Sequence, residues 1–343
     1  MKISKRVQWR LKVFFTLVAI TSMGGPLYAA LFGAPFESFV FPKNMIPSLF
    51  GGSLIWGFEV LLVPSRLGRF IRHLPFFWAV LTRLVVVFAV VTGLGPFANF
   101  FLNGVFDPLY SFKIGYSIYL YVSIVVFLLF SISHVVRIVG PRVLANIIFG
   151  RYHRPKRENR IFLFLDIKGS TKLSEEFGDI GVQHLIARFF LDITEPILEW
   201  GGEVHRYIGD EVVIMWTLNH GIKNANCLRC CFAIQDHIKT RAAFYQRIYG
   251  VVPEFRIGLH GGPVVAAQCG DIKQEIVFFG DIINTTALIE QYCKTAERDL
   301  LISDALYDKL PKSDDWTAES IGSVVLRGRQ KEIGLIAVSH DPS

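Results

Sequence analysis

Four apolar stretches of about twenty residues fill most of the first 133 positions, and they constrain the fold more than any other feature. A helix needs about 20 mostly apolar residues to cross the hydrocarbon core of a bilayer. Because none of the four stretches has a polar face, they are predicted to be membrane spans and not buried core helices. The expected spans are residues 11–31, 45–63, 75–97 and 114–133.

The composition indicates a chain with two different halves. Hydrophobic residues make up 52% and charged residues 19% of the chain, against ~45–50% and ~25% in soluble domains. The apolar excess falls within residues 11–136, whereas residues 150–343 resemble an ordinary globular domain. An ordinary soluble protein, a disordered chain and a disulfide scaffold are excluded, and the five Cys are expected as reduced thiols.

Predicted loops that are rich in basic residues alternate with loops that contain few, and this pattern predicts the orientation of the spans in the membrane. They cluster before the first span, between the second and third, and after the fourth, whereas the other two loops hold only Lys43 and Lys113. Basic loops face the cytoplasm. The sequence therefore predicts a multi-pass protein of the inner or plasma membrane, with both termini and the globular half in the cytoplasm. The clustered residues are Lys2, Lys5, Arg6, Arg10, Lys12, Arg66, Arg69, Arg72, Arg137, Arg142, Arg151, Arg154, Lys156 and Arg157.

Two ionisable residues lie inside the predicted spans. Glu59 is near the cytoplasmic end of the second span and Arg83 is near the cytoplasmic start of the third. A lone charge in a span costs about 2.5–3.5 kcal/mol on insertion scales, so pairing of the two is expected. Such a pair can be a signal-sensing element or a purely structural contact.

The predicted domains are a membrane domain (residues 1–134), a connector (135–160) and a cytoplasmic catalytic domain (161–343). The connector is expected to hold a short helix, interrupted at Pro141, and then the basic run at residues 151–157. Next to a span, this run is typical of a surface that faces phospholipids, and no nucleic-acid partner is expected.

The globular half begins with a predicted strand at residues 161–165 that ends at Asp166. Gly169 then leads into a helix, with Ser170 or Thr171 as the expected N-cap. A carboxylate at a strand end, beside free N–H groups at a helix start, suits a polyphosphate bound to a metal ion.

A second carboxylate lies in a predicted hairpin. Residues 203–208 and 211–216 read as strands, and Gly209-Asp210 suits a two-residue type II′ turn. If the hairpin pairs with the first strand, Asp166 and Asp210 converge, and two carboxylates with a backbone carbonyl can hold two Mg²⁺ ions. The element order β-α-β-β-α-β predicts a ferredoxin-like antiparallel sheet with helices on one face.

This half resembles the catalytic domain of class III nucleotidyl cyclases over about residues 151–340. The predicted fold class is thus an all-α N-terminal bundle of four transmembrane helices plus an α+β ferredoxin-like catalytic domain. The segments that carry the resemblance are residues 164–171, Gly201-Gly202 with residues 206–210, and residues 255–262, 280–284 and 326–329.

The resemblance implies roles for individual residues. Asp166, Asp210 and the Ile167 carbonyl match the ligands of two Mg²⁺ or Mn²⁺ ions, one activating the ribose 3′-OH and the other neutralising the triphosphate. Asn284 matches the residue that orients the ribose. It also implies a homodimer with shared sites that converts ATP to cyclic AMP and pyrophosphate. The positions that match substrate-binding residues are Gly169, Ser170, Thr171, Arg206, Arg256, Val277 and Arg329.

Three positions depart from the family pattern. Leu288 stands where the family has its transition-state arginine, which contributes ~10³–10⁵ in rate in phosphoryl transfer, so slow catalysis is expected. Arg206 and Val277 replace the Lys and the Asp or Thr that read the base. Lys294 or Arg298, further along the same helix, are candidate substitutes for the arginine. The alternatives are a weak or inactive regulatory protein and a guanylate cyclase; a diguanylate cyclase is disfavoured by Lys168-Gly169-Ser170-Thr171.

Overall fold

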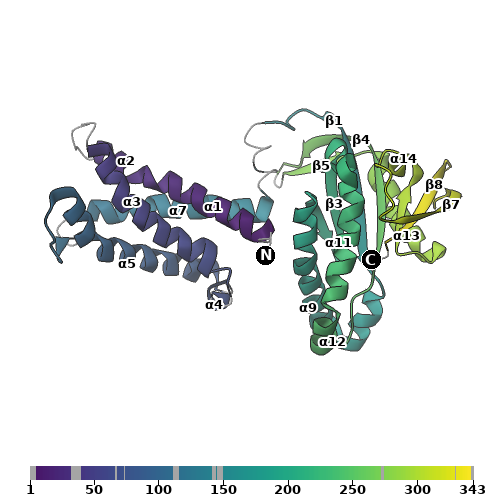
Figure 1. Cartoon of the computed structure of the whole chain (residues 1–343), viewed down its shortest axis with the longest axis horizontal. Coiled ribbons are helices and arrows are strands. Elements are labelled where there is room, and N and C mark those ends of the chain that lie inside the picture. Colours follow the sequence, from purple (N-terminus) through teal and green to yellow (C-terminus); the bar gives the residue numbers. More distant parts are fainter. Residues whose placement is uncertain are drawn as a thin grey trace. The chain divides into compact units, whose positions relative to one another are not determined.

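The computed structural model describes residues 5–31, 40–65, 68–72, 74–110, 116–140, 144, 150–271, 274–328 and 330–340. The chain divides into two compact units, Met1–Leu144 and Ala145–Ser343 (Figure 1). The first unit is helical and the second contains a mixed sheet with helices, as the sequence predicts.

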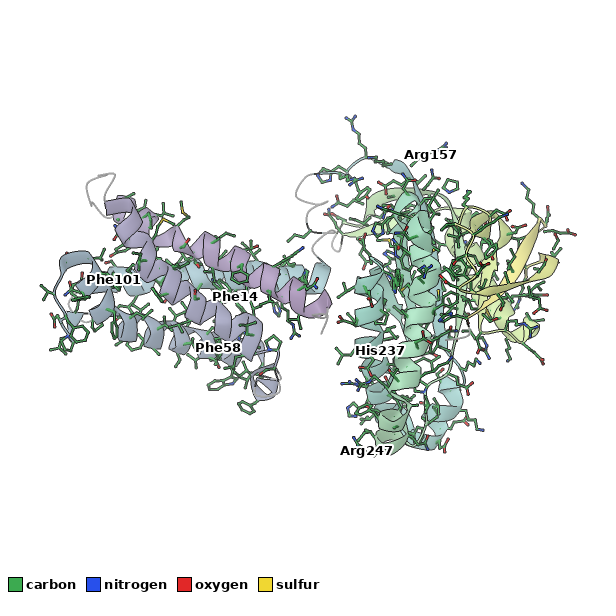
Figure 2. All side chains as sticks on the ribbon, in the orientation of Figure 1. Phe14, Phe58, Phe101, Arg157, His237 and Arg247 are labelled. Carbon is green, nitrogen blue, oxygen red and sulfur yellow. The ribbon has the colours of Figure 1, made fainter. Side chains whose placement is uncertain are left out.

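Within the described residues, the first unit has four helical segments long and apolar enough to cross a membrane. They are Val7–Leu31, Asn44–Leu62, Phe77–Asn103 and Tyr116–Val136, close to the predicted spans. Large apolar side chains such as Phe101 face outwards (Figure 2), which suits contact with lipid. The elements are α1 (Lys5–Ser22), α2 (Gly24–Leu31), α3 (Val40–Trp56), the π-helix η1 (Gly57–Leu62), α4 (Arg69–Arg72), α5 (Phe76–Asn103) and α7 (Tyr116–Val139).

Glu59 and Arg83 form the expected ion pair. The Arg83 Nη2 atom lies 2.9 Å from Glu59 Oε2, and both side chains are largely buried. The guanidinium also donates from Nη1 to the Ala79 carbonyl at 2.6 Å and lies 4.1 Å from the centre of the Phe130 ring on α7. Glu59 belongs to η1, and π-helical turns recur at functional sites. The pair therefore links η1, α5 and α7.

The second unit is built on an eight-stranded sheet in the order β2-β3-β1-β4-β6-β8-β7, with β5 paired to β4. Strands β2, β3, β1 and β4 are antiparallel neighbours, which gives the predicted ferredoxin-like core. The sheet then continues through β6, which is parallel to β4. The strands are β1 (Lys156–Ile167), β2 (Glu203–Ile208), β3 (Glu211–Thr217), β4 (Phe255–Cys269), β5 (Glu275–Phe279), β6 (Leu300–Ser303), β7 (Thr317–Val325) and β8 (Glu332–Ser339).

Side chains of β1 alternate between two apolar layers, so this strand is buried on both faces. Ile161, Leu163 and Leu165 pack with helices α9 and α11, whereas Phe162 and Phe164 pack on the opposite face. Figure 1 shows α9, α11 and α12 lying together beside the sheet. The helices of this unit are α9 (Ser170–Glu199), α10 (Leu218–Ile222), the 3₁₀ turn η2 (Lys223–Ala225), α11 (Asn226–Thr240), α12 (Ala242–Tyr249), α13 (Asp281–Ala296) and α14 (Asp304–Tyr307).

The core helices α9 and α11 share one face of the sheet, as predicted, whereas α13 lies on the other face. Ile282 of α13 belongs to the apolar cluster that contains Phe162 and Phe278, on the face opposite α9. The expected N-cap is wrong, because α9 already begins at Ser170 and Gly169 precedes it with φ of 68°. In addition, α9 is broken at Gly178, whose φ and ψ of 72° and 162° are not helical.

The connector differs from its predicted bounds at both ends. Helix α7 continues to Val139, and β1 begins at Lys156, so the end of the predicted connector belongs to the sheet. Pro141 and most of the predicted connector helix lie outside the described residues. Cys227, Cys230 and Cys231 are buried free thiols on α11, in agreement with helix packing.

Candidate active site

Three charged residues form one row across β3, β1 and β4 at one end of these strands, on the face that α13 covers. Asp166 of β1 pairs with Glu211 of β3 on one side and with Arg256 of β4 on the other. Directly paired residues on neighbouring antiparallel strands have Cβ atoms about 4.5–5.5 Å apart. The strand register alone thus places two carboxylates beside one guanidinium.

Asp210 joins this row from the β2–β3 turn. Only Gly209 of the two turn residues has a positive φ, 62°, which fits the predicted type II′ turn. The carboxyls of Asp166 and Asp210 are close enough to share a hydrogen bond. The predicted convergence of the two aspartates is therefore present in the fold.

Glu290 of α13 adds a fourth carboxylate that sequence reasoning missed. Its side chain is buried, and the charges nearest to it include those of Asp166, Glu211 and Arg256. Helix α13 reaches this position because Gly258 lies beneath it on β4. A Cβ atom on Gly258 would come within 2.5 Å of the Glu290 backbone nitrogen.

The crowding of carboxylates raises several pKa values. Burial, together with the adjacent Asp210, raises the pKa of Asp166 to about 6, although Arg256 opposes the shift. Burial and the charges of Asp166 and Asp210 raise the pKa of Glu211 to about 7. Burial and the charge of Asp166 likewise raise the pKa of Glu290 to about 7. The site therefore carries more negative charge than Arg256 balances.

This arrangement fits divalent cations by its donor chemistry. Carboxylate and carbonyl oxygens are the ligands that Mg²⁺ and Mn²⁺ prefer, and a cation would relieve the repulsion between Asp166 and Asp210. Among the described residues, no group of three His, Cys, Asp or Glu side chains is arranged to hold a metal ion by itself. The two aspartates would therefore need further oxygen ligands, such as the Ile167 carbonyl or phosphate oxygens of a substrate.

The turn after β1 presents free backbone donors beside these carboxylates. Gly169 takes a left-handed conformation, and no side chain caps the first turn of α9, so its N–H groups are open to an anion. Lys168 is fixed next to this turn, because its backbone N–H donates to the Glu254 carbonyl and its Nζ atom pairs with Asp299 at 2.6 Å. The turn that was predicted to hold phosphates is thus uncapped, and Thr171 is exposed.

A bulge in β2 sets the direction of Arg206. The register shifts between Val204 and Arg206, so His205 is the extra residue and packs against Phe278. Arg206 forms an ion pair with Glu275 of β5. Glu275 lies two residues from Val277, so alternation puts both on one side of β5. Sequence reasoning missed Glu275 because this pairing depends on the bulge.

The predicted residues of α13 lie in different surroundings. Asn284 is exposed near the start of the helix, whereas Leu288 is half-buried against an apolar cluster that includes Leu301 and Leu326. Arg298 pairs with Glu319 at 2.8 Å, so its charge is engaged away from the carboxylates. Arg329 lies outside the described residues.

Comparison with known proteins identifies the unit that contains this site. The family model of the adenylate and guanylate cyclase catalytic domain matches residues 153–337. The chain belongs to this family. The matched segment contains every described strand of the sheet apart from the end of β8, and it includes all four carboxylates.

Individual relatives agree with this assignment. Adenylate cyclase 2 of Rhizobium meliloti is 38% identical over 202 residues, which cover 59% of this chain and 56% of the relative. An adenylate cyclase of Anabaena cylindrica is 24% identical over 211 residues, which cover 59% of this chain and 40% of the relative. This chain therefore spans about half the length of these relatives.

Solved structures agree in fold. A bacterial light-regulated adenylyl cyclase matches 63% of this chain and 62% of its own, with a TM-score of 0.54 and 22% identity. The adenylyl cyclase CyaB from P. aeruginosa matches 55% of this chain and 97% of its own, with a TM-score of 0.48 and 19% identity. On the family match, the second unit is a class III cyclase catalytic domain, as the sequence motifs predicted.

Proposed function

We propose that this protein is a membrane-bound adenylate cyclase that converts ATP to 3′,5′-cyclic AMP and pyrophosphate. The observation that carries the proposal is the convergence of Asp166 and Asp210 at one end of the sheet, beside the uncapped start of α9. The 38% identity to a protein named adenylate cyclase 2 supports ATP as the substrate. Four long apolar helices support a membrane location, and the basic loops of the sequence support a cytoplasmic location of both termini.

The residues of the site fall into two groups, those that would bind metal ions and those that would bind phosphate groups. Asp166, Asp210 and the Ile167 carbonyl would hold two Mg²⁺ or Mn²⁺ ions. When bound, such ions supply Lewis-acid activation of the ribose 3′-OH and neutralise charge on the triphosphate. The N–H groups at the start of α9 would bind phosphate oxygens, as helix N-termini do. Arg256 adds positive charge beside Asp166.

A second copy of the chain would complete the site. Ile208 is about half exposed on β2, where it pairs with Glu211 immediately before the turn that carries Asp210. Apolar side chains beside a charged site favour cover by a partner. A homodimer with the site at the interface would also bring Asn284, exposed on α13, towards the ribose of a nucleotide.

A weak or inactive regulatory domain is the second candidate, and one observation favours it. Leu288 packs with apolar neighbours at the position of the family's transition-state arginine. A leucine cannot donate hydrogen bonds to the phosphoryl oxygens, so chemistry would be slow. The intact carboxylates favour slow catalysis over none.

The proposal predicts that Asp166→Asn and Asp210→Asn each abolish cyclic AMP formation. Each change removes a negative oxygen ligand, so the rate should fall by at least about 100-fold. The measurement is cyclic AMP output from ATP and Mn²⁺ by the full-length chain. Asp308→Asn, which removes an exposed carboxylate near α14, is the matched control and should keep the activity. Unchanged turnover in either site variant, in a folded protein, would refute the metal assignment.

A further inference from the structure

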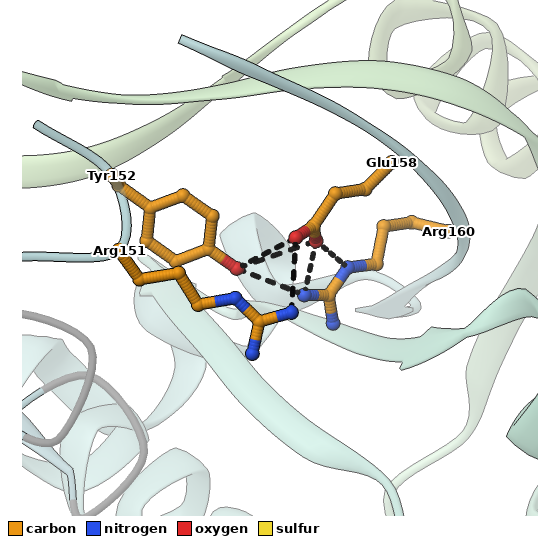
Figure 3. Close-up of polar contacts among 4 residues, drawn as sticks. All are labelled: Arg151, Tyr152, Glu158 and Arg160. Carbon is orange, nitrogen blue, oxygen red and sulfur yellow. Dashed lines mark hydrogen bonds and ion pairs between the residues drawn. The ribbon is translucent and has the colours of Figure 1, made fainter. Parts of the chain in front are cut away.

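A polar network ties Arg151 and Tyr152 to Glu158 and Arg160 of β1 (Figure 3). The Arg160 guanidinium donates to Glu158 Oε2 from Nε at 3.0 Å and from Nη2 at 2.6 Å. The Tyr152 hydroxyl donates to Glu158 at 3.2 Å and accepts from Arg160 Nη2 at 3.3 Å. Tyr152 and Arg160 are only 3% and 6% exposed, so water competes little with these bonds.

Backbone and apolar contacts hold the same segment. The Gln268 N–H donates to the Tyr152 carbonyl at 3.0 Å, and β1 pairs with the far end of β4 from Lys156 onwards. The Tyr152 ring belongs to the apolar cluster that contains Phe278, and Arg160 lies 5.5 Å from the centre of the Phe278 ring. The start of this unit is therefore a fixed part of its sheet.

This anchoring leaves three cationic side chains on the surface. Arg154, Lys156 and Arg157 are exposed, and within the described parts of the chain none of them has an ion-pair or side-chain hydrogen-bond partner. Figure 2 shows Arg157 at the outer end of β1, at the periphery of the unit. These three residues are called the basic patch.

Acidic residues near the basic patch do not neutralise it. Glu158 is engaged by Arg160 and contacts Arg151 at 3.5 Å, so its charge is directed inwards. Glu275 of the neighbouring β5 is paired with Arg206. Asp271 is exposed in the turn between β4 and β5, and Asp166 lies at the opposite end of β1; these are the remaining acidic residues among the described residues of β1, β4, β5 and that turn. The patch therefore keeps a net positive charge.

The chain itself keeps the basic patch near the membrane. The last apolar helix ends at Val139, and the anchored segment begins twelve residues later at Arg151. Twelve residues span at most about 40 Å when fully extended. We infer that the basic patch is a binding surface for anionic phospholipid headgroups, which holds the catalytic unit against the cytoplasmic leaflet. This inference rests on the proposed membrane orientation.

The physics favours a lipid surface over a soluble polyanion. Each Lys or Arg close to an anionic leaflet strengthens binding about five-fold, so three of them give on the order of 100-fold. A preformed patch does not need to be ordered on binding, which avoids an entropic cost. The tether supplies a high effective concentration of headgroups, whereas nucleic acid would have to bind from solution.

The test measures the distance of the patch from lipid headgroups in the full-length chain. Asn159→Cys, in a Cys269→Ser background, provides one exposed labelling site, because the other four cysteines are buried. The chain is placed in nanodiscs that contain headgroup-nitroxide lipids, with phosphatidylcholine alone or with about 30% phosphatidylglycerol. We expect at least two-fold stronger fluorescence quenching with phosphatidylglycerol, and loss of the difference in about 1 M salt.

Two charge-matched variants decide the outcome. The triple variant Arg154→Gln, Lys156→Gln and Arg157→Gln should lose the response to phosphatidylglycerol. The triple variant Arg247→Gln, Lys309→Gln and Lys312→Gln removes three exposed cations elsewhere in the unit and should keep it. Equal responses in the two variants would overturn the inference.

Two further readouts distinguish lipid binding from catalysis and from nucleic-acid binding. Cyclic AMP output from the same nanodiscs reports the proposed function separately. Failure of the lipid-binding inference can therefore be distinguished from failure of the proposed cyclase activity. A labelled single-stranded oligonucleotide serves as the competing polyanion. The lipid assignment would be overturned in favour of nucleic acid by two observations together. The oligonucleotide would bind the wild type but not the patch variant, and the quenching would not depend on the lipid composition.

Discussion

At the residue scale, Leu288 stands at the position where the family pattern has its transition-state arginine, and we propose that this one residue limits the rate. It lies one helical turn beyond Asn284 on α13, so both side chains share a side of the helix. Asn284 is exposed, whereas Leu288 contacts the apolar cluster around Ile289 and Leu335. The half-buried position leaves part of its side chain at the surface, where a long cationic side chain can extend its charged end into water.

We predict that Leu288→Arg raises kcat about 10-fold, or about 1.4 kcal/mol of barrier, with little change in KM. The restored guanidinium would act mainly in the transition state, where charge develops on the α-phosphoryl oxygens. Steady-state kinetics and thermal unfolding of the variant are the measurements. A folded variant without a rate gain would refute the idea that the missing arginine limits catalysis. Leu288→Gln, which is polar but uncharged, is the control.

The sequence alone predicted those residues of the site that can be recognised from their immediate sequence context. Asp166 follows a recognisable strand and Asp210 occupies a recognisable turn, so both could be predicted. Glu211 and Glu290 could not, because their approach to Asp166 depends on strand register and on the packing of α13. Glu211 directly follows Asp210, and this adjacency was the one feature of the sequence that could have predicted a place for Glu211 in the site.

The contact between α13 and β4 is the element-scale feature that assembles the site. Gly258 allows the α13 backbone to lie directly on β4, where a Cβ atom would come 2.5 Å from the Glu290 nitrogen and 2.9 Å from the Thr286 carbonyl oxygen. Backbone atoms cannot move aside as a flexible side chain can. Any side chain at position 258 must therefore displace the helix that carries Glu290 and Asn284.

We predict that Gly258→Ala destabilises the catalytic unit by about 3 kcal/mol and abolishes activity, because overpacking displaces α13. Hydrogen exchange and thermal unfolding of the full-length chain are the measurements. Gly262→Ala is the control on the same strand, since its Cβ would meet Ile282 Cδ1 at an ordinary 3.6 Å. Equal stability of the two variants would contradict the close approach.

The sequence predicted the elements of the ferredoxin-like core better than their arrangement. Apolar runs and turn residues identified β1 and the β2–β3 hairpin. The position of α13 opposite α9 was missed, because an amphipathic pattern does not tell which face of a sheet a helix covers. The break of α9 at Gly178 was missed for a related reason, since the apolar spacing of residues 173–193 continues across it.

On the scale of the whole molecule, the chain joins a helical unit to a cyclase catalytic unit. The helical unit contains the buried Glu59–Arg83 pair, which links three helical segments and supports a precise arrangement of the spans. In the catalytic unit, the residues before β1 are tied to that strand through the hydrogen bond between Tyr152 and Arg160.

The orientation of the spans gives a whole-molecule prediction. Basic residues of the predicted cytoplasmic loops predict that the other two loops lie outside. Reporter fusions after residues 40 and 105 should therefore report a location outside the cytoplasm. A fusion at the C-terminus, as the control, should report the cytoplasm. A cytoplasmic signal from either loop would contradict the four-span orientation.

Cyclic nucleotide formation by the full-length chain in nanodiscs decides whether the molecule is an adenylate cyclase. With Mn²⁺ or Mg²⁺, we predict cyclic AMP from ATP at least about 10-fold faster than cyclic GMP from GTP, which corresponds to ~1.4 kcal/mol. The rate per chain should rise with the density of chains, as a shared dimer site requires. Asp210→Asn provides the blank. Output from ATP no greater than that blank, or a preference for GTP, would contradict the proposed activity.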